Sequence, residues 1–447
     1  MERNVYKNLV EWKLARDRKP LILKGARQVG KTYLLRDFGQ KEFPAYHYFN
    51  FEKDSKLFSV FEQDLVPKRV LSELAVHAGK SINPGSDLVI FDEIQECPKA
   101  LNSLKYFCED IPELALCAAG SLLGVSLSAE SFPVGKIQFM NLYPLTFEEF
   151  LRAEDDGKGV GLLDEARQKD IVPEVIHHYL MQKLKTYFFM GGMPSVVMAY
   201  LTYGDDTYER VQRVRRTQSD LMNSYHRDFA KHSGKTNSMH IVSVFENVPL
   251  QLSRFLDAST QRYRFRGVVP GKRGYTDLCG PIDWLEKAGL ILKVKICNLA
   301  QLPLESFCRE NIFKLYHFDI GLLGCMLDLP PEAILNQDYG LAKGFFAENF
   351  AAQEFVASGA SSIYAWSERN SEIEFLRIIG GDIIPVEVKS GRSTQAKSLG
   401  QFIRKYSPRY AVKLSAQNLR RETKKIVRNY PLYLAGSIAG GDLNVKN

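Results

Sequence analysis

The 447-residue sequence has no apolar run long enough to cross a membrane. Its longest stretch without a charged residue lies between Glu113 and Glu130 and is broken by Gly120, Ser121 and Gly124. A membrane helix needs about 20 apolar residues, so this stretch fits a buried strand and a turn better. The first residues also lack the apolar segment of a secretory signal. These absences predict a cytoplasmic protein without a membrane partner.

The chain has only seven cysteines, and no two of them form a C-x-x-C pair. An odd number at irregular spacing argues against a disulfide framework and offers no zinc-site pattern. We therefore expect reduced cysteines that pack as small hydrophobic side chains. The sequence also lacks internal repeats and low-complexity tracts. Its length then predicts about three globular domains.

Positive charge is modest overall, at +7, but it is concentrated in two segments. Residues 209–275 hold 13 Lys and Arg against 5 Asp and Glu, and residues 397–447 hold 11 against 2. Such segments predict contact with the phosphates of a nucleic acid. A solvated helix face is an alternative of equal weight.

Six arginines are the candidates for phosphate contact: Arg213, Arg215, Arg216, Arg262, Arg264 and Arg266. The last three alternate with Tyr263 and Phe265, so on a strand all three would share one face. An exposed sheet edge that uses charge to prevent aggregation is the alternative.

Short apolar runs alternate with helical patterns over the first 150 residues. The runs cover residues 21–23, 46–51, 88–91 and 114–119. This alternation predicts a parallel sheet with helices on both faces. Charge and glycine in residues 154–170 favour a surface loop or a domain boundary.

The remaining chain predicts two more domains. Residues 161–335 are mostly helical, and the helix, turn and strand over 276–296 resemble a winged helix, with an ordinary helix–turn–strand as the alternative. From residue 336 the pattern returns to mixed α and β. We therefore expect domains over 1–160, 161–335 and 336–447.

A phosphate-binding loop follows the first predicted strand. The G-x-x-x-x-G-K-[ST] motif is matched at every fixed position by Gly25, Ala26, Arg27, Gln28, Val29, Gly30, Lys31 and Thr32. The strand before it and the helix after it are the context that the motif requires. Backbone N–H groups would surround the phosphates of ATP. Lys31 would neutralise the β- and γ-phosphates, and Thr32 would bind Mg²⁺.

An acidic pair ends the apolar strand over residues 88–91. Asp92 would lie at the carboxyl edge of the sheet beside the loop, where it can hold the Mg²⁺ shell. Glu93 is then positioned to polarise the attacking water as a general base. A buried strand that merely ends in two surface acids is the alternative.

Two weaker candidates accompany the loop. Ser121 follows the strand over 114–119 and would contact the γ-phosphate or the water, unless it is only a turn serine. Lys136, after Gly135, is a candidate second cation. No residue is identified as an arginine finger, so the sequence implies no ring assembly and leaves the oligomeric state open.

A hairpin near the C-terminus combines acids and a lysine. Residues 371–379 and 382–389 are β-rich and flank Gly380-Gly381. A two-residue loop would pair Glu374 with Glu387, and opposed carboxylates repel unless a cation lies between them. With Lys389 on the face of Glu387, and Glu348 on a preceding helix, these residues predict metal-dependent phosphodiester cleavage. An amphipathic hairpin with a wet face is the alternative.

The whole set of motifs resembles the prokaryotic AAA-type ATPases with a C-terminal domain of unknown function that looks like a PD-(D/E)xK nuclease. The resemblance rests on the P-loop, residues 91–95, Gly120-Ser121, residues 142–150, residues 191–194, residues 314–323 and residues 386–389. It implies ATP binding and hydrolysis, a helical lid and a C-terminal α/β restriction-endonuclease-like domain. Two positions depart from the family. Glu374 stands where Asp is usual, and Lys136 where relatives often have Arg.

We interpret the chain as an ATP-dependent switch or motor coupled to a tail that faces nucleic acid. The rival is a regulatory ATPase whose degenerate tail only binds protein or nucleic acid. A small-molecule kinase is a weaker third reading, because no acceptor-site signature is present.

Overall fold

The computed structural model describes residues 1–121, 135–154, 157–168, 171–202, 206–233, 235–254, 262–336, 342–360, 362–390, 397–419 and 426–438. The chain forms two compact units. The N-terminal unit comprises Met1–Tyr143 with Lys287–Gly289, and the C-terminal unit comprises Pro144–Glu286 with Leu290–Asn447.

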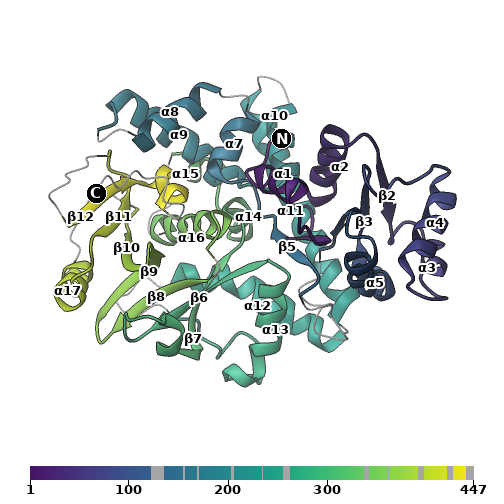
Figure 1. The fold of residues 1–447 in the computed structure, drawn as a ribbon. Helices are drawn as coiled ribbons and strands as arrows, with labels where there is room; N and C mark the ends of the chain where they lie inside the picture. Colours follow the sequence, from purple (N-terminus) through teal and green to yellow (C-terminus); the bar gives the residue numbers. More distant parts are fainter. Residues whose placement is uncertain are drawn as a thin grey trace. The chain divides into compact units, whose positions relative to one another are not determined.

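The N-terminal unit contains a parallel sheet with strand order β2-β3-β4-β1-β5 (Figure 1). Its strands are β1 (Leu21–Lys24), β2 (Tyr46–Asn50), β3 (Leu88–Asp92), β4 (Ala115–Ala119) and β5 (Gln138–Asn141). Every residue of β3 and β4 is buried, as expected for central parallel strands that are covered on both faces. The predicted parallel sheet is therefore confirmed.

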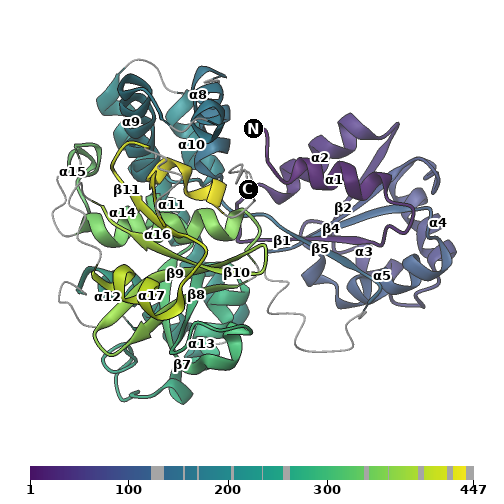
Figure 2. The ribbon, with the colours of Figure 1, turned by 60° about the vertical axis from the view of Figure 1, so that its left-hand side comes forward.

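Helices cover both faces of this sheet, with α1 and α2 on one side and α3 and α5 on the other (Figure 2). The helices are α1 (Tyr6–Leu14), α2 (Lys31–Glu42), α3 (Leu57–Val60), α4 (Pro67–Ala78), the 3-10 turn η1 (Ile94–Glu96) and α5 (Pro98–Asp110). The rings of Phe51 and Phe61 both pack edge-on against Phe91 of β3, at 5.5 and 5.9 Å. This aromatic core holds the strand that ends in Asp92.

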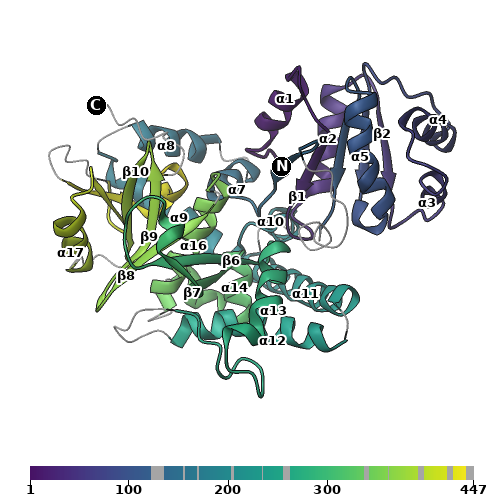
Figure 3. The same ribbon diagram turned by 60° about the horizontal axis from the view of Figure 1, so that its bottom comes forward.

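The C-terminal unit is built on a mixed sheet with strand order β12-β11-β10-β9-β8-β6-β7. Its strands are β6 (Ile291–Cys297), β7 (Cys308–His317), β8 (Ile363–Glu368), β9 (Ser371–Ile379), β10 (Asp382–Val388), β11 (Ala411–Ser415) and β12 (Val427–Pro431). Helices α16 and α17 lie on opposite sides of β8–β10 (Figure 3).

The helices and 3-10 turns of this unit come mostly before the sheet in sequence. They are α7 (Phe147–Ala153), α8 (Gly157–Gln168), α9 (Glu174–Met190), α10 (Pro194–Thr202), α11 (Thr207–Ser233), α12 (Lys235–Arg254), α13 (Tyr275–Lys287), η2 (Leu304–Phe307), α14 (Ile320–Met326), α15 (Pro331–Leu335), α16 (Ala342–Ala357), α17 (Lys397–Tyr406) and η3 (Leu432–Ile438).

The sheet crosses the predicted boundary at residue 335. Strand β6 pairs in parallel with β8, and β7 pairs with β6, so the strands before residue 335 complete the sheet formed after it. The helix and strand over 276–296 exist, as α13 and β6, but they do not form a separate winged-helix unit. The boundary predicted at residue 160 also differs from the structure, because the main segment of the N-terminal unit ends at Tyr143.

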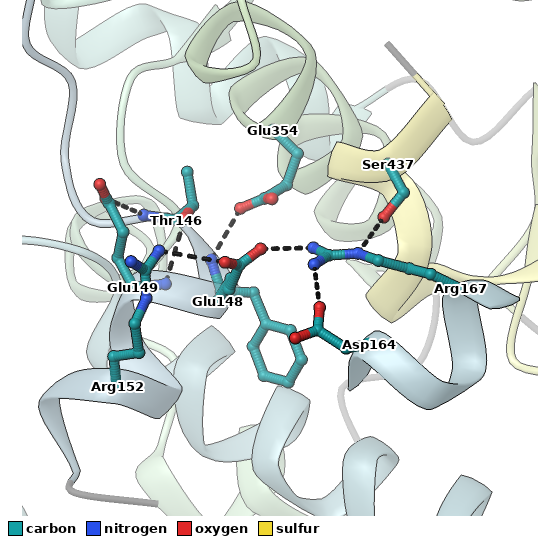
Figure 4. Close-up of polar contacts among 9 residues, drawn as sticks. Thr146, Glu148, Glu149, Arg152, Asp164, Arg167, Glu354 and Ser437 are labelled. Atoms are coloured by element: carbon teal, nitrogen blue, oxygen red, sulfur yellow. Dashed lines mark hydrogen bonds and ion pairs between the residues drawn. The ribbon is translucent and has the colours of Figure 1, made fainter. Parts of the chain in front are cut away.

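Within residues 154–170, the described residues 157–168 are not the surface loop that charge and glycine content indicated. Residues 157–168 form α8, with Leu163 and Ala166 buried. Arg167 on this helix forms ion pairs with Glu148 and, at 2.7 Å, with Asp164. Its Nε donates to the Ser437 hydroxyl at 2.8 Å (Figure 4). Tertiary ion pairs and burial therefore override the weak helical propensity of glycine.

The same region shows why α7 begins where it does. Thr146 caps the helix and Glu149 completes a capping box, as Figure 4 shows. Glu354 of α16 accepts a further hydrogen bond from the Phe147 N–H, at 2.9 Å. Two glutamate side chains thus accept hydrogen bonds from N–H groups that would otherwise be unpaired at one helix N-terminus.

Helix α16 carries four buried polar residues. Besides Glu354, Asn349 bonds both backbone groups of His317, at 2.7 and 2.9 Å. Gln353 accepts from the Ile320 N–H at 3.0 Å and donates to the Tyr187 hydroxyl at 2.6 Å. The fourth residue, Glu348, belongs to a cluster described below. Each of these side chains therefore has a partner, as burial requires.

All seven cysteines are free. No helix in the described part of the chain is long and apolar enough to span a membrane.

Burial raises the pKa of Glu354 from 4.5 to about 8, and the carboxylates of Glu149 and Glu148 add to this effect. The folded protein therefore binds this proton more tightly than the unfolded chain does. Stability from this group is present below about pH 4.5 and is lost as the pH rises toward about 8. Glu354→Gln keeps an acceptor for Phe147 and cannot ionise. As the pH rises from about 4.5 to about 8, the unfolding free energy of the wild type should fall by more than that of Glu354→Gln. We expect the difference between the two decreases to exceed about 1 kcal/mol.

Chemical denaturation at a series of pH values measures this difference. Glu332→Gln, at an exposed glutamate, is the matched control and should follow the wild type. Parallel pH profiles for wild type and Glu354→Gln would contradict the assignment.

Candidate functional site

The phosphate-binding loop joins β1 to α2, as predicted. Gly25 has φ +154°, and a Cβ there would lie 2.1 Å from the Leu142 carbonyl oxygen, so only glycine fits. Gly30 caps α2 in the left-handed region, at φ 98°. Lys31 and Thr32 are then the first two residues of the helix. A glycine-rich loop that leads into a helix N-terminus is the geometry of an anion site.

Lys31 is almost fully buried beneath the loop. Its Nζ donates to the carbonyl oxygens of Gly25 and Ala26, both at 2.8 Å. Burial lowers the pKa of Lys31 to about 8, against the opposing effect of Glu93 and Asp92. Its ammonium group is thus held inside the loop by weak acceptors that a phosphate oxygen can replace.

Asp92 meets Thr32, as the sequence predicted. The Thr32 hydroxyl donates to Asp92 Oδ2 at 2.9 Å, and the Tyr48 hydroxyl and the Asn50 amide donate to the same oxygen, at 2.6 and 3.1 Å. A hydroxyl and a carboxylate at this distance are the donor set that Mg²⁺ uses beside nucleotide phosphates. The residues present therefore fit this ion.

Glu93 directly follows β3 in a left-handed conformation, at φ 49°, which is uncommon for a residue with a side chain. Gln95 Nε2 donates to Glu93 Oε2 at 2.6 Å and orients the carboxylate. Neither Gln95 nor the Asn50 contact was predicted. Asn50 could have been found, because it ends β2 directly opposite Asp92 in the parallel register.

The two weaker candidates, Ser121 and Lys136, lie at opposite edges of the sheet. β4 lies between β3 and β1, so the buried Ser121, two residues beyond its end, lies at the edge that carries Asp92 and the loop. Lys136 precedes β5, whose Gln138 pairs with Leu21 at the start of β1. It therefore lies at the opposite, amino-terminal edge, where it pairs with Glu109 at 3.1 Å. The structure does not bring Lys136 to the P-loop of its own chain.

Arg3 is a loop contact that the sequence did not suggest. Its side chain is buried, and its guanidinium donates to the carbonyl oxygens of Val29 at 3.0 Å and Tyr143 at 2.5 Å. It therefore ties the phosphate-binding loop to the chain that leaves the sheet.

The C-terminal hairpin has the predicted register. Gly380 and Gly381 both have positive φ, as a type I′ turn requires. Asp382 pairs with Ile379, and the register continues to Val386 opposite Phe375. Glu374 and Glu387 are the residues directly beyond the last pair of this register.

The sequence predicted a metal ion between the two acids, but the structure places the ammonium group of Lys389 there. Its Nζ lies 3.3 Å from Glu374 Oε1 and 3.1 Å from Glu387 Oε1. Burial raises the pKa of Glu374 to about 7, against the opposing effect of Lys389. Glu387 is also buried, and no described residue forms a hydrogen bond with its Oε2.

A second lysine, Lys314 of β7, enters the same cluster. It is buried between Glu372, with which it forms a close ion pair, and Glu348, 4.0 Å away. Although burial opposes it, Glu372 and Glu348 raise the pKa of Lys314. The Tyr316 hydroxyl donates to Glu348 Oε2 at 2.7 Å. The sequence had marked residues 314–323 only as a family motif.

We call these seven residues the carboxylate–lysine cluster: Lys314, Tyr316, Glu348, Glu372, Glu374, Glu387 and Lys389. In the described part of the chain, no three His, Cys, Asp or Glu side chains are arranged to hold a metal ion. The unpartnered oxygen of Glu387 is the feature that a cation would satisfy.

The candidate phosphate-binding arginines differ in exposure. Arg215 is used in packing, because it donates to the Leu329 carbonyl at 2.6 Å and lies over the Phe189 ring. Arg262, Arg264 and Arg266 are exposed, whereas Tyr263 is buried between the first two. The alternation holds only for Arg262 to Arg264, because residues 262–265 form no strand and Arg266 lies in a turn.

In the second basic segment, residues 397–447, several basic side chains are paired or buried. Lys405 pairs with Glu368, Arg409 pairs with Asp382, and Lys413 is buried. Five of its basic residues lie outside the described residues: Arg420, Arg421, Lys424, Lys425 and Lys446.

Three family models match consecutive segments of the chain. Residues 17–151 match an AAA domain. Residues 181–333 and 343–433 match two domains of unknown function, DUF8612 and DUF4143. The strand order, the P-loop and Asp92 agree with the first match. The N-terminal unit therefore has the fold of an AAA-type P-loop ATPase.

Similar solved structures include three proteins of low identity. They are the Aeropyrum pernix ORC1 protein in complex with DNA (14% identity, 75% of this chain and 95% of that chain, TM-score 0.26), Drosophila ORC bound to DNA (14%, 72% and 94%, 0.27) and a variant of Thermotoga maritima RuvB (13%, 67% and 89%, 0.27). Likenesses with TM-scores this low carry no argument about this chain. No curated protein matches the sequence.

The Arg3 contacts predict a stabilising role. Arg3→Ala removes a charged donor from two carbonyl oxygens, which should lower the unfolding free energy of the N-terminal unit by about 1.5–3 kcal/mol. Denaturant unfolding measures the loss, and Lys7→Ala, at an exposed position, is the control. Equal stability of the two variants would show that Arg3 does not hold the loop.

Proposed function

We propose that this chain binds and hydrolyses ATP with Mg²⁺ and couples the nucleotide state to a C-terminal tail that faces nucleic acid. The contact between Thr32 and Asp92 beneath a complete phosphate-binding loop carries the proposal. The match to an AAA domain supports it.

Each residue then has a role in hydrolysis. Thr32 and Asp92 would hold Mg²⁺, which supplies charge neutralisation at the phosphates when bound. Lys31 would leave the carbonyl oxygens of Gly25 and Ala26 for the β- and γ-phosphates. Glu93, oriented by Gln95, would accept a proton from the attacking water. Ser121 would contact the γ-phosphate or that water.

Two variants test this assignment. Lys31→Ala should abolish or cripple ATP binding, because the phosphates lose their main point charge. Glu93→Gln should keep ATP binding but lower turnover about 10²–10⁴-fold, the usual effect of removing a general base. Nucleotide titration and a phosphate-release assay measure the two effects.

Lys136→Ala is the control, because Lys136 lies at the opposite edge of the sheet from the P-loop of its own chain. Within a single chain it should leave ATP binding and turnover unchanged. Unchanged affinity in Lys31→Ala would reject the P-loop assignment. Wild-type turnover in Glu93→Gln would reject the general base alone.

A second candidate activity belongs to the carboxylate–lysine cluster: metal-dependent phosphodiester cleavage. The shared contact of Glu374 and Glu387 with the Lys389 ammonium group and the unpartnered oxygen of Glu387 favour it. Glu348 and Lys389 would complete the set, as the family resemblance implies. The alternative is a degenerate tail that binds without cleaving, and Lys314 favours this alternative because its charge opposes that of a metal ion.

Manganese binding separates the two. Lys314→Met should raise Mn²⁺ affinity at least about tenfold, which corresponds to about 1.4 kcal/mol, because it removes the competing ammonium group. Glu387→Ala should abolish binding. Calorimetric titration measures both, beside a plasmid-nicking assay.

Lys293→Met is the matched control, because Lys293 is a largely buried lysine that lies 3.6 Å from Asp283 and 3.5 Å from Glu286. Mn²⁺ affinity that is equal in Lys314→Met, Glu387→Ala and wild type would show that the cluster is not a metal site.

A further inference from the structure

A cavity of about 720 Å³ opens in the C-terminal unit beside β6–β8. Of the residues that line it, three are arginines, two are neutral polar residues and three are apolar: Arg262, Arg264, Arg309, Asn298, Ser367, Ile296, Phe307 and Ile312. None of these described lining residues is acidic. The cavity therefore joins a concentrated positive charge to an apolar wall.

The backbone that presents two of these arginines is fixed. The Tyr263 N–H donates to the Phe313 carbonyl at 2.8 Å, so residues 262–264 run along β7. The Tyr263 ring stacks on that of Phe313, with centroids 6.0 Å apart. The buried Gln251 side chain bonds both backbone groups of Arg264, at 2.8 and 2.7 Å. Arg262 and Arg264 are thus held on the side away from Tyr263.

The cavity lies on the face of the sheet that carries the carboxylate–lysine cluster. Ser367 lines the cavity and pairs directly with Glu372 of the cluster, and opposed residues share a face. Ile312 also lines it and is two residues from Lys314 on β7, so these side chains share a face as well. The cavity and the acids therefore lie on the same face of the sheet.

We infer that this cavity binds a single strand of nucleic acid. Arginines recognise phosphates with paired N–H donors, and an aromatic wall at Phe307 offers a surface for an unpaired base. A duplex exposes the edges of its bases in the grooves but keeps their faces stacked inside, so it offers no base face to the apolar wall. The inference rests on the proposed nucleic-acid-facing tail and specifies where, and in which form, the tail binds it.

The test uses a fluorescein-labelled oligothymidylate and the full chain, with anisotropy as the readout. Arg262→Gln, Arg264→Gln and Arg309→Gln combined should lower affinity at least about tenfold and make the log–log salt slope less negative by about 2, since each single-strand phosphate contact contributes about −0.7. Phe307→Leu keeps an apolar side chain but removes the ring, and should weaken binding of the strand without changing the salt slope.

The control combines Arg227→Gln, Arg404→Gln and Lys405→Gln, three exposed positions on α11 and α17 with the same change in charge. Equal weakening by both triple variants would overturn the inference. The strand would then be attracted by the positive charge of the whole protein and not by the cavity. A wild type that binds thymidine monophosphate or duplex DNA as tightly as the strand would also overturn it.

The outcome is separable from that of the proposed function. Lys31→Ala should bind the oligonucleotide like the wild type, and the cavity triple variant should keep its basal ATP hydrolysis. If the wild type binds the strand and the cavity variant binds it equally well, this inference fails while the proposed tail function stands. If the wild type binds no nucleic acid at low salt, both fail, and ATP hydrolysis is judged by the phosphate-release assay alone.

Discussion

Helix α16 fixes the C-terminal unit through the hydrogen bonds of its buried polar side chains. Asn349, Gln353 and Glu354 bond the backbone of β7, α14 and α7, which lie far apart in the sequence. A buried polar group without a partner costs about 1–3 kcal/mol. Apolar packing tolerates small shifts, but this set of bonds is satisfied together only in one position of the helix. The helix therefore specifies where its neighbours begin and end.

The two candidate sites hold buried charge in different ways. In the N-terminal unit, Lys31 is bonded to neutral carbonyl oxygens of its own loop, which a charged phosphate can replace at a gain. In the C-terminal unit, Lys314 and Lys389 are bonded to carboxylates, and a ligand must break ion pairs that are shielded from water. The first arrangement is ready for an anion, whereas the second can take up a further ion only if existing ion pairs rearrange.

The sequence allowed the local features to be predicted well. The P-loop has fixed spacing, and the hairpin register follows from the length of the Gly380-Gly381 turn, so both were predictable to the residue. Asp92 was predictable because parallel strands end at a common edge. Arg3 and Lys314 were not, because each bonds to residues far away in the sequence. Helix α8 was missed for the same reason, since Arg167 meets Glu148 and Ser437 only in the folded unit.

The domain boundaries show a related limit. Periodicity describes one element at a time, but it does not reveal that β6 and β7 share a sheet with strands that begin only at Ile363. Their apolar patterns fit an isolated hairpin equally well. Only the pairing of β6 with β8 shows that the helical middle region and the C-terminal strands are one unit.

Helix α16 also forms a short mechanical link. Glu354 is bonded to the first residue of α7, just after the chain enters the C-terminal unit, and Glu348 reaches the carboxylate–lysine cluster. The helix between these two glutamates is a rigid rod of about 9 Å. Tension on the incoming polypeptide would reach Glu354 first and would be passed along this rod to Glu348. Because Asn349 lies between these two glutamates and bonds the backbone of β7, a pull on the chain would act on the carboxylate–lysine cluster and on this strand together.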